Sequence, residues 1–409
     1  MTRIAFVADP HIGNHKRVGG QMLAGLNDRC RFTLDSLFQA CKTAHFNGCS
    51  TLYIIGDLYD NVSIGARIIA ATQDLLAAAK ANGLDVVIST GNHDSITGEP
   101  GDHVIGPLRF VARIVDKPII DRHENCDVVV VPYKPGPAAV WLRQALSEVQ
   151  REDSEFDDRS LNSASNVPSR PRILAVHLGI AHEGTPAFMQ DECSMRLETL
   201  QNLLREFSYS ALVAGHWHDY YQSQKTNPMI IQLGALAPTG WDNPGVRNRG
   251  VMAILDGTTF RHVTIPGPRF VKAVGQAGFD GVKQAVKESP DCKLFVEWVV
   301  APDEAEDARA DLAIYKDRDM IHYGLVVADT TQATEEARKA ATAARSAATL
   351  AESLEAYVTK LALPVNVTRE RVLELARRFM GLSRPLRTVS RPRSVRTCPT
   401  RSRLLRRWG

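Results

Sequence analysis

The sequence predicts an α/β protein in which strands and helices alternate along the chain. Short apolar or β-branched runs recur through the first 220 residues, as expected for buried strands. Stretches with apolar residues at helical spacing separate these runs. Several runs end at a Gly, Asn or Asp turn. This alternation indicates a sheet with helices packed on its faces.

Six strands and four helices are predicted in this region. The strands are residues 4–8, 51–55, 86–89, 128–131, 173–176 and 211–214. The helices are residues 32–44, 65–82, 138–149 and 196–207. Residues 152–172 are polar and rich in turn formers, which predicts a surface loop. Residues 229–265 carry regularly spaced glycines, which predicts short β hairpins forming a second sheet that closes the domain.

The chain after residue 265 is predicted to form three further parts. Residues 266–330 hold a strand at 294–300, a helix at 303–315 and a strand at 320–327, which indicates a small α/β domain. Residues 331–382 are predicted to form a pair of helices that Leu363-Pro364 separates, with Thr368 capping the second. Residues 383–409 have no periodic apolar pattern and are predicted to be a disordered tail.

The second helix of the pair has one apolar face. Val372, Leu375, Ala376 and Phe379 fall on it at helical spacing. This face either packs on its own domain or forms a docking surface for a partner, and the sequence favours the two alternatives about equally.

Composition restricts the class of protein. A chain of 409 residues predicts two or three domains, with 1–265 as the largest. No apolar run is long enough to cross a bilayer, and the strand at residues 4–8 leaves no room for a signal peptide. The seven cysteines form no Cys-x-x-Cys pair. They are interpreted as reduced thiols of a cytoplasmic protein.

The net charge of +3 hides an uneven distribution. Residues 383–409 contain nine arginines and no acidic residue, so the preceding part carries 40 basic and 46 acidic residues, or −6. An acidic body does not favour tight binding of DNA by the protein alone. Bound metal ions and local basic patches could still neutralise phosphates.

Five motifs with metal-binding side chains follow predicted strands. They are Asp9-Pro10-His11, Gly56-Asp57-Leu58-Tyr59-Asp60, Gly91-Asn92-His93-Asp94, His177 and Gly215-His216-Trp217-His218. In open α/β sheets ligands bind beyond the carboxyl ends of the strands. Each motif alone is weak, because an isolated histidine or Gly-Asp turn is usually structural. The full set in this order predicts a site for two metal ions.

The residue types suggest how two cations would be held. Asp57 is the best candidate for a carboxylate that bridges both ions, with Asp9, His11 and His218 completing one site. The other site would take its ligands from Asn92, His177 and His216. Carboxylate, amide and imidazole ligands suit Mn²⁺, Fe²⁺ or Zn²⁺. Two such ions would polarise a phosphate ester and activate a bridging water.

Three further residues are predicted to act without binding metal. His93 is expected to stabilise charge on the phosphate and protonate the leaving oxygen. Asp94 is expected to orient the His93 imidazole. Asp60 is expected to hydrogen bond to a metal ligand.

With these motifs the chain resembles the calcineurin-like metallophosphoesterase superfamily. All five blocks are present without a substitution at a ligand position. The motif spacing, the run Gly234-Ala235-Leu236-Ala237-Pro238 and the C-terminal parts resemble the SbcD-type nuclease subunit, including phage recombination endonuclease subunits. The resemblance implies a four-layer α/β/β/α sandwich, a small α/β cap domain that shapes DNA access, and a C-terminal helical pair.

The same resemblance implies cofactors and partners. Two divalent ions, usually Mn²⁺, would bind to the seven ligands named above, with His93 catalytic. The implied activities are exonuclease and endonuclease cleavage of DNA. The helical pair would dock on an SbcC-type coiled-coil ATPase, and the nuclease subunit would form a homodimer. Some nucleases of this type have a histidine where Asp60 stands here, and the arginine-rich tail matches no part of the family.

Loops near the motifs suggest where DNA could bind. The candidates are His15, Lys16 and Arg17 after the first motif, and Arg247 and Arg249 in the later loops. Such contacts would position the phosphates without reading sequence. A solvated surface patch is the alternative, and for any single residue the sequence slightly favours it.

Two other functions use the same motifs. The chain could be a small-molecule phosphodiesterase, for example for cyclic nucleotides, or a phosphoprotein phosphatase. It could also be a scaffold that keeps the fold without the chemistry, although the intact Asp57, Asn92 and His93 argue against that.

Overall fold

The computed structural model describes residues 3–16, 19–160, 170–183, 185, 191–223, 228–239, 250–267, 269–288, 294–313, 321–327, 368–371 and 373. The chain divides into two units, residues 1–330 and 331–409. Most of the second unit, including the predicted tail at 383–409, lies outside the described residues. Within it, Thr368 Oγ1 accepts a hydrogen bond from the Arg371 backbone N–H at 3.3 Å, as predicted for a helix cap.

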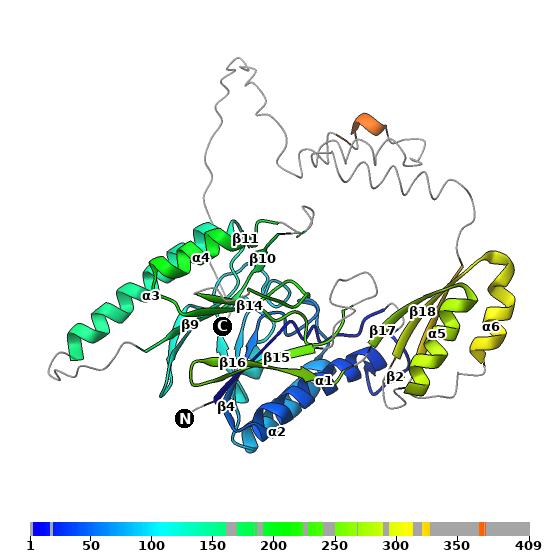
Figure 1. Cartoon of the computed structure of the whole chain (residues 1–409), viewed down its shortest axis with the longest axis horizontal. Coiled ribbons are helices and arrows are strands. Elements are labelled where there is room, and N and C mark those ends of the chain that lie inside the picture. The colour runs from blue at the N-terminus through cyan, green and yellow to red at the C-terminus, as the bar shows by residue number, and fades with distance from the viewer. Residues whose placement is uncertain are drawn as a thin grey trace, which may run out of the picture. The chain divides into compact units, whose positions relative to one another are not determined.

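Two six-stranded sheets form most of the first unit (Figure 1). The first sheet has the order β16 (Thr259–Ile265), β15 (Gly250–Asp256), β1 (Arg3–Ala8), β4 (Cys49–Ile55), β5 (Asp85–Ser89), β6 (Arg113–Val115). The second has the order β13 (Tyr221–Gln222), β14 (Met229–Gln232), β12 (Ala211–Gly215), β9 (Arg172–His177), β8 (Asp127–Val131), β7 (Ile119–Arg122). In the first sheet β1, β4, β5 and β6 are parallel, and β15 and β16 are added antiparallel at one edge. In the second sheet β14, β12, β9 and β8 are parallel, and the edge strands β13 and β7 are antiparallel. All six predicted strands are confirmed.

Alternation along the strands produces the layers. In β1, Phe6 joins the apolar core that lies between the two sheets, whereas Val7 joins the core beneath the helices. In β9, Ala175 faces the core between the sheets and Val176 faces the opposite side. Successive side chains of a strand point to opposite faces, so each sheet has an apolar core on both of its faces. The predicted four-layer α/β/β/α sandwich is therefore confirmed.

Four long helices form the outer layers (Figure 1). Residues of α1 (Asp28–Phe46) and α2 (Ala66–Ala81) belong to the core of the first sheet. Residues of α3 (Ala138–Ser160) and α4 (Leu197–Glu206) belong to the core of the second. Asn27 caps α1, because its side-chain oxygen accepts a hydrogen bond from the Cys30 backbone N–H at 2.9 Å. All four predicted helices are present.

The prediction of a loop at residues 152–172 is wrong for residues 152–160, because α3 continues to Ser160. Asp153 is buried and forms ion pairs with Arg122, at 2.7 Å, and with Arg172. These partners come from β7 and β9, so they could not be recognised in the local sequence. Residues 161–169 lie outside the described part of the chain.

The prediction that residues 229–265 form a separate sheet is also wrong. β14 adds to the second sheet, parallel to β12. β15 and β16 form a hairpin that adds to the first sheet, with β15 antiparallel to β1. Each strand therefore extends a sheet that already exists, because an open sheet edge offers unpaired backbone groups.

A smaller α/β module follows residue 265. Its three parallel strands have the order β17 (Arg269–Val274), β18 (Leu294–Val300), β19 (Ile321–Val327). The helices α5 (Gly275–Glu288) and α6 (Ala305–Ala313) connect them. The predicted strands at 294–300 and 320–327 and the intervening helix are present. The sequence did not indicate β17 and α5, because α5 contains three glycines, which lower its helical propensity.

Short elements complete the described structure. They are β2 (Met22–Leu23), β3 (Leu26–Asn27), β10 (Gly179–Ala181), β11 (Ser194–Arg196) and the 3₁₀ turns at Gly106–Phe110 and Pro302–Glu304. In the part of the chain that the structure describes, no helix is both long and apolar enough to cross a membrane. Cys30, Cys41, Cys49, Cys126 and Cys193 are free thiols.

We expect the Phe6→Ala variant to lose about 3–5 kcal/mol of unfolding free energy, because Phe6 is fully buried between the sheets and its ring stacks on Tyr53 at 5.2 Å. Urea denaturation measures the loss. Phe110 is 85% exposed, so the matched Phe110→Ala variant should change the free energy by less than about 0.5 kcal/mol. Equal effects of the two variants would contradict the layer arrangement.

Candidate metal centre

The five motifs meet where the two sheets lie face to face. β1, β4 and β5 are neighbours in the first sheet, and Asp9, Asp57 and Asn92 follow their carboxyl ends. β9 and β12 are neighbours in the second sheet, and His177 and His216 lie at their carboxyl ends. Parallel strands bring their carboxyl ends to one edge, so residues distant in sequence converge.

Asp57 occupies the centre of this cluster. Its Oδ2 lies 3.6 Å from His11 Nε2 and 3.4 Å from His177 Nε2. Two groups of side chains have atoms close enough to hold a metal ion: Asp57 with His11 and His93, and Asp57 with His177 and His216. Asp57 belongs to both groups, which is the geometry expected of a bridging carboxylate.

On one side of Asp57 two imidazoles face each other. His11 Nε2 and His218 Nε2 are 2.9 Å apart, although 207 residues separate them in the chain. His11 is 2% exposed, so its imidazole lies inside the protein. Thus His218 lies on the same side of the site as His11, as predicted.

On the other side of Asp57 an amide oxygen joins two imidazoles. Asn92 Oδ1 lies 3.0 Å from His177 Nε2 and 3.0 Å from His216 Nδ1. The structure therefore brings together the predicted second set of ligands.

Asp9 lies between the sheets and contacts His177 and His216 of the predicted second set of ligands. Its carboxylate accepts a hydrogen bond from the His216 backbone N–H, at 2.9 and 3.0 Å to the two oxygens. Asp9 Oδ1 also lies 3.5 Å from His177 Nδ1. Asp9 thus links the end of β1 to both strands that supply the imidazoles.

Two motif glycines pack directly against predicted ligands, and a third packs against the end of β4. A Cβ atom on Gly91 would lie 2.1 Å from Asp57 Oδ1, and one on Gly56 would lie 2.1 Å from His177 Nδ1. A Cβ on Gly215 would lie 2.5 Å from the Ile55 carbonyl oxygen. Real Cβ atoms do not approach so closely, so each motif needs glycine before its ligand for steric reasons.

Four predicted ligands lie in left-handed backbone conformations. The φ angles are +50° at Asp9, +48° at His11, +46° at Asp57 and +92° at His216. Residues other than glycine rarely adopt such angles, which cost about 1–3 kcal/mol each and are concentrated at functional sites. The surrounding strands hold these four residues in strained positions, which supports a role in binding.

Burial keeps two of the imidazoles neutral. It lowers the pKa of His11 well below its usual range, and the adjacent His218 lowers it further. It also lowers the pKa of His218 to about 4. A histidine binds a metal ion only in its neutral form, so both residues are prepared for binding at pH 7.

The pKa of His177 is shifted in the opposite direction, because acidic side chains lie beside it. Burial lowers the pKa of His177, but the charge of Asp57 outweighs this and brings the pKa to about 9. Burial would raise the pKa of Asp57, yet His177 and the other imidazoles hold it below its usual range. Burial raises the pKa of Asp9 well above its usual range, and His177 offsets this only in part.

The donor set fits a pair of divalent cations. Carboxylate, amide and imidazole donors converge in a buried site, and Asp57 belongs to both groups. Among the described residues, no group forms a hydrogen bond with the buried His11 Nδ1. Cations would supply the positive charge that the buried Asp9 and Asp57 side chains lack.

The structure corrects the predicted role of Asp94. Its carboxylate accepts hydrogen bonds from the backbone N–H groups of Leu58, Tyr59 and Gly91, at 3.0–3.1 Å, and so joins two motif loops. The His93 imidazole is instead positioned by the Asp60 carbonyl oxygen, 2.5 Å from His93 Nδ1. A carboxyl group that satisfies three backbone donors has little capacity left to orient a side chain.

Asp60 contacts the site through its carboxylate as well. Its Oδ1 lies 3.8 Å from His11 Nδ1, which is too long for the hydrogen bond to a metal ligand that the sequence predicted. Asp60 Oδ2 lies 3.6 Å from His15 Nδ1, and His15 Nε2 lies 3.2 Å from the His11 carbonyl oxygen. His15 is therefore tied to the residues behind the metal site, which does not fit the predicted DNA contact.

Of the other residues predicted to contact DNA, the structure describes only Lys16. Lys16 is exposed. Arg17, Arg247 and Arg249 lie outside the described residues.

Three groups that support ligands were not predicted from the sequence. Thr239 Oγ1 lies 3.1 Å from His218 Nδ1, and the Ile55 carbonyl oxygen lies 3.1 Å from His177 Nδ1. Asp191 Oδ2 lies 3.3 Å from His216 Nε2. Such groups set the tautomer and direction of a ligating imidazole. Thr239 directly follows the run Gly234–Pro238, and Ile55 directly precedes the Gly56-Asp57 motif, whereas no sequence signal lay near Asp191.

Comparisons with known proteins agree with this site. The family model described as calcineurin-like phosphoesterase matches residues 2–220, more than half of the chain. No curated protein sequence shows significant similarity to the chain.

Several solved structures resemble the fold weakly. An archaeal phosphodiesterase has a TM-score of 0.33 and 11% identity, with 64% of this chain and 100% of that chain covered. A dimetal phosphatase from Danio rerio has a TM-score of 0.39 and 13% identity, with 64% and 99% covered. A putative 5'-nucleotidase from Staphylococcus aureus has a TM-score of 0.38 and 14% identity, with 64% and 53% covered. These values are too low to support a functional argument.

We expect the Gly91→Ala variant to lose metal ions, because the added Cβ would displace the Asp57 carboxylate. Plasma emission spectroscopy should find fewer than two ions per chain after reconstitution with Mn²⁺. Hydrolysis of bis-p-nitrophenyl phosphate should fall by about 100-fold or more. Gly65 has open space around its Cβ position, so Gly65→Ala is the control and should retain both properties. Full metal content in Gly91→Ala would contradict the packing argument.

The affinity for Mn²⁺ should rise with pH. His177 has a pKa of about 9 without metal and must lose its proton to bind, so each pH unit below 9 weakens binding by up to about tenfold. Isothermal titration at pH 6.5, 7.5 and 8.5 measures the trend. Repeating it in buffers with different ionisation enthalpies should reveal release of about one proton. A constant affinity over this range would show that His177 is not protonated.

Proposed function

The chain belongs to the calcineurin-like phosphoesterase family, and from this premise we propose that it is a metal-dependent nuclease that cleaves DNA. In this proposal it is the exonuclease and endonuclease subunit of an SbcCD-like recombination and repair complex in the cytoplasm. The observation that carries the DNA part is the additional α/β module of β17, β18 and β19, which a minimal phosphoesterase would not need.

The module contacts the phosphoesterase domain through aromatic residues. The Phe295 ring lies 5.5 Å from that of Phe32 in α1, and Phe270 stacks on Phe295 at 4.8 Å. The Arg29 guanidinium lies 4.9 Å from the centre of the Phe270 ring. These contacts support a cap domain that shapes access to the metal centre.

Arg29 connects this contact to a metal ligand. Its guanidinium donates a hydrogen bond of 2.6 Å to the Thr239 carbonyl oxygen, and the Thr239 hydroxyl lies 3.1 Å from His218 Nδ1. Movement of the module could therefore reach His218 through two hydrogen bonds. A substrate large enough to touch the module, such as DNA, would make use of this connection.

The family uses a dinuclear divalent metal centre, and we propose that Mn²⁺ is the native ion because the ligands combine carboxylate, amide and imidazole groups. When bound, the two ions polarise the phosphodiester and activate a water molecule for attack. The residues that would hold them are Asp9, His11, Asp57, Asn92, His177, His216 and His218.

The protein itself supplies the group that handles the proton of the leaving oxygen. A carbonyl oxygen only accepts hydrogen bonds, so His93 Nδ1 must donate to the Asp60 carbonyl. The other ring nitrogen, Nε2, is then the atom available to exchange a proton with the substrate. The His93 backbone N–H also donates to Asp57 Oδ1 at 2.8 Å, which fixes the residue beside the metal ligands.

The proposal includes two partners that the sequence suggests. Residues 331–382 would dock on an SbcC-type coiled-coil ATPase, with the helix that begins after Thr368 forming part of the surface. The nuclease subunit would form a homodimer. The five free thiols of the described residues fit a reducing cytoplasm.

Purified protein with Mn²⁺ should cleave linear single-stranded and double-stranded DNA, and chelation with EDTA should abolish cleavage. Denaturing gels with end-labelled oligonucleotides measure the products. Absence of cleavage with and without an ATPase partner would contradict the nuclease proposal. Turnover of cyclic nucleotides with DNA untouched would instead favour a small-molecule phosphodiesterase.

The His93→Gln variant should separate catalysis from metal binding. We expect it to keep both metal ions and to lose about 10²–10⁴-fold in kcat, because general acid catalysis contributes that much. His45→Gln is the matched control, because His45 is an exposed residue of α1 outside the metal centre. Loss of metal in His93→Gln would mean that His93 is a ligand, a role that its distance from His11 and Asp57 also permits.

A further inference from the structure

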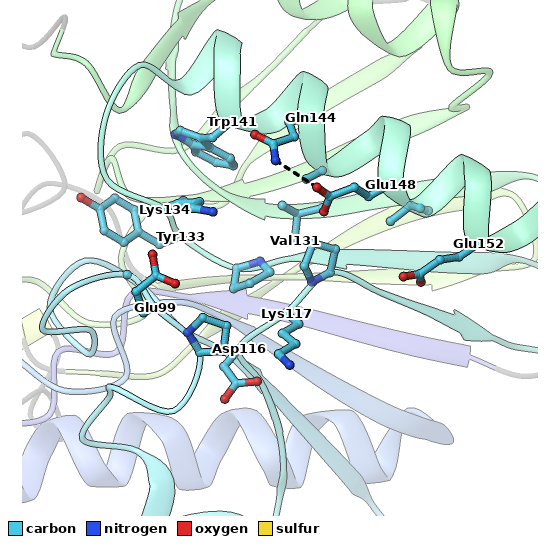
Figure 2. A pocket seen from close by; sticks show the side chains of 16 residues that line it. Glu99, Asp116, Lys117, Val131, Tyr133, Lys134, Trp141, Gln144, Glu148 and Glu152 are labelled. Carbon is cyan, nitrogen blue, oxygen red and sulfur yellow. Dashed lines mark hydrogen bonds between the residues drawn. The ribbon is translucent and has the colours of Figure 1, made fainter.

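A pocket of about 320 Å³ lies between α3 and the loops that follow β5 and β6 (Figure 2). Its walls are formed by residues 98–100, 116–118 and 131–134, and by Trp141, Gln144, Ala145, Glu148, Val149 and Glu152 of α3. In Figure 2 the α3 side chains form the upper wall, and Asp116 and Lys117 lie on the opposite one. A cavity of this size suits a small organic group.

Tyr133 connects the pocket to the metal centre. It lines one end of the pocket, and its ring lies 6.3 Å from the ring of the metal ligand His177. Its backbone N–H donates to the Thr90 carbonyl oxygen at 2.9 Å, and Thr90 directly precedes Gly91 and Asn92. A group in the pocket could thus be joined to a phosphate at the metal centre by a short linker.

Trp141 lines the same end of the pocket. Its side chain is 6% exposed, and among the described residues no group accepts a hydrogen bond from its indole N–H. The indole nitrogen is itself buried, so it contributes no hydrogen bond to a ligand in the pocket. The aromatic rings of Trp141 and Tyr133 provide faces on which a planar ring can stack.

The charges of the pocket exclude a phosphate as its occupant. Four carboxylates line it, from Glu99, Asp116, Glu148 and Glu152, against two lysines, Lys117 and Lys134. Asp116 already accepts hydrogen bonds from the Gly101 N–H at 3.0 Å and from His103 at 3.3 Å. Glu148 accepts a hydrogen bond from the Gln144 side chain at 3.0 Å. Glu99 and Glu152 favour a ligand that carries N–H donors.

A nucleobase has all of these properties. It is planar, and adenine, guanine and cytosine have amino groups for the carboxylates. We infer that this pocket binds one base of the nucleic acid whose phosphate lies at the metal centre. The inference rests on the proposed nuclease function, because it assigns the pocket to that substrate.

Base binding here has a consequence for the form of DNA that is cleaved. A base stacked and paired in a duplex cannot enter a pocket, so it must first leave the helix at a cost of a few kcal/mol. Single-stranded or frayed ends avoid this cost. The nuclease should therefore cleave an unpaired end faster than the same sequence in a blunt duplex.

The Gln144→Trp variant tests the inference, because Gln144 is an exposed residue of α3 that lines the pocket, and an indole there would fill it. We expect KM for a short single-stranded oligonucleotide to rise by about tenfold, which is the loss of one stacked base. Hydrolysis of bis-p-nitrophenyl phosphate, which has no base, should stay within about twofold of wild type. The different response of the two substrates distinguishes a base site from damage to the metal centre.

Two control variants sharpen this test. Gln150→Trp places the same side chain on the same helix outside the pocket, and it should leave both substrates unaffected. Gln144→Ala removes the 3.0 Å hydrogen bond to Glu148 without filling the pocket, and it should retain most of the oligonucleotide affinity. Equal oligonucleotide kinetics in Gln144→Trp and Gln150→Trp would overturn the inference while leaving the nuclease proposal intact.

Binding of free adenosine provides the second measurement. Wild type should bind it with an affinity that Gln144→Trp reduces by about tenfold, measured by isothermal titration. Adenosine binding of this kind in a protein that cleaves no DNA would support the base pocket and overturn the nuclease function. No adenosine binding by a wild type that cleaves oligonucleotides would overturn the base pocket.

Discussion

The Asp57 carboxylate contacts side chains that follow strands of both sheets, and the rest of the site is arranged around it. It lies 3.4 Å from His177 at the end of β9 and 3.6 Å from His11 after β1, and it accepts the His93 N–H. A buried carboxylate in such a place requires compensating charge. In the absence of metal, His177 supplies it by keeping its proton. Metal binding would therefore replace the positive charge of the His177 proton beside Asp57 with the positive charge of the cations.

The same constraint explains the form of the motifs. Asp57 and His177 each approach a glycine so closely that no side chain fits there, and Asp9, His11, Asp57 and His216 lie in left-handed conformations. The cores on both sides of each sheet must therefore stabilise these positions. This is why the ligands are placed directly after buried strands rather than in the middle of long loops, where the backbone would relax.

The side chains that converge at the site and the central strands could be predicted from the sequence because both depend on local patterns. A buried strand that ends in Gly-Asp or Gly-Asn-His is visible within a few residues. The roles of Asp94, Asp191 and Thr239 could not be predicted, since each depends on a hydrogen bond to a residue brought close only by folding. The extension of α3 depends likewise on Asp153 pairing with distant arginines. Long-range polar pairing leaves no periodic signal.

The surroundings of the metal centre bear on its substrate as much as the ligands do. Metal ions recognise the phosphate, which all substrates of the family share, so selection among them must come from neighbouring groups. On one side the Arg29 and Thr239 hydrogen bonds lead from His218 to the aromatic residues of the α/β module. On the other, Tyr133 lies between His177 and an acidic pocket. A phosphate bound between these two surfaces would have its flanking groups in contact with both of them, and the proposed DNA substrate offers such groups on either side of each phosphate.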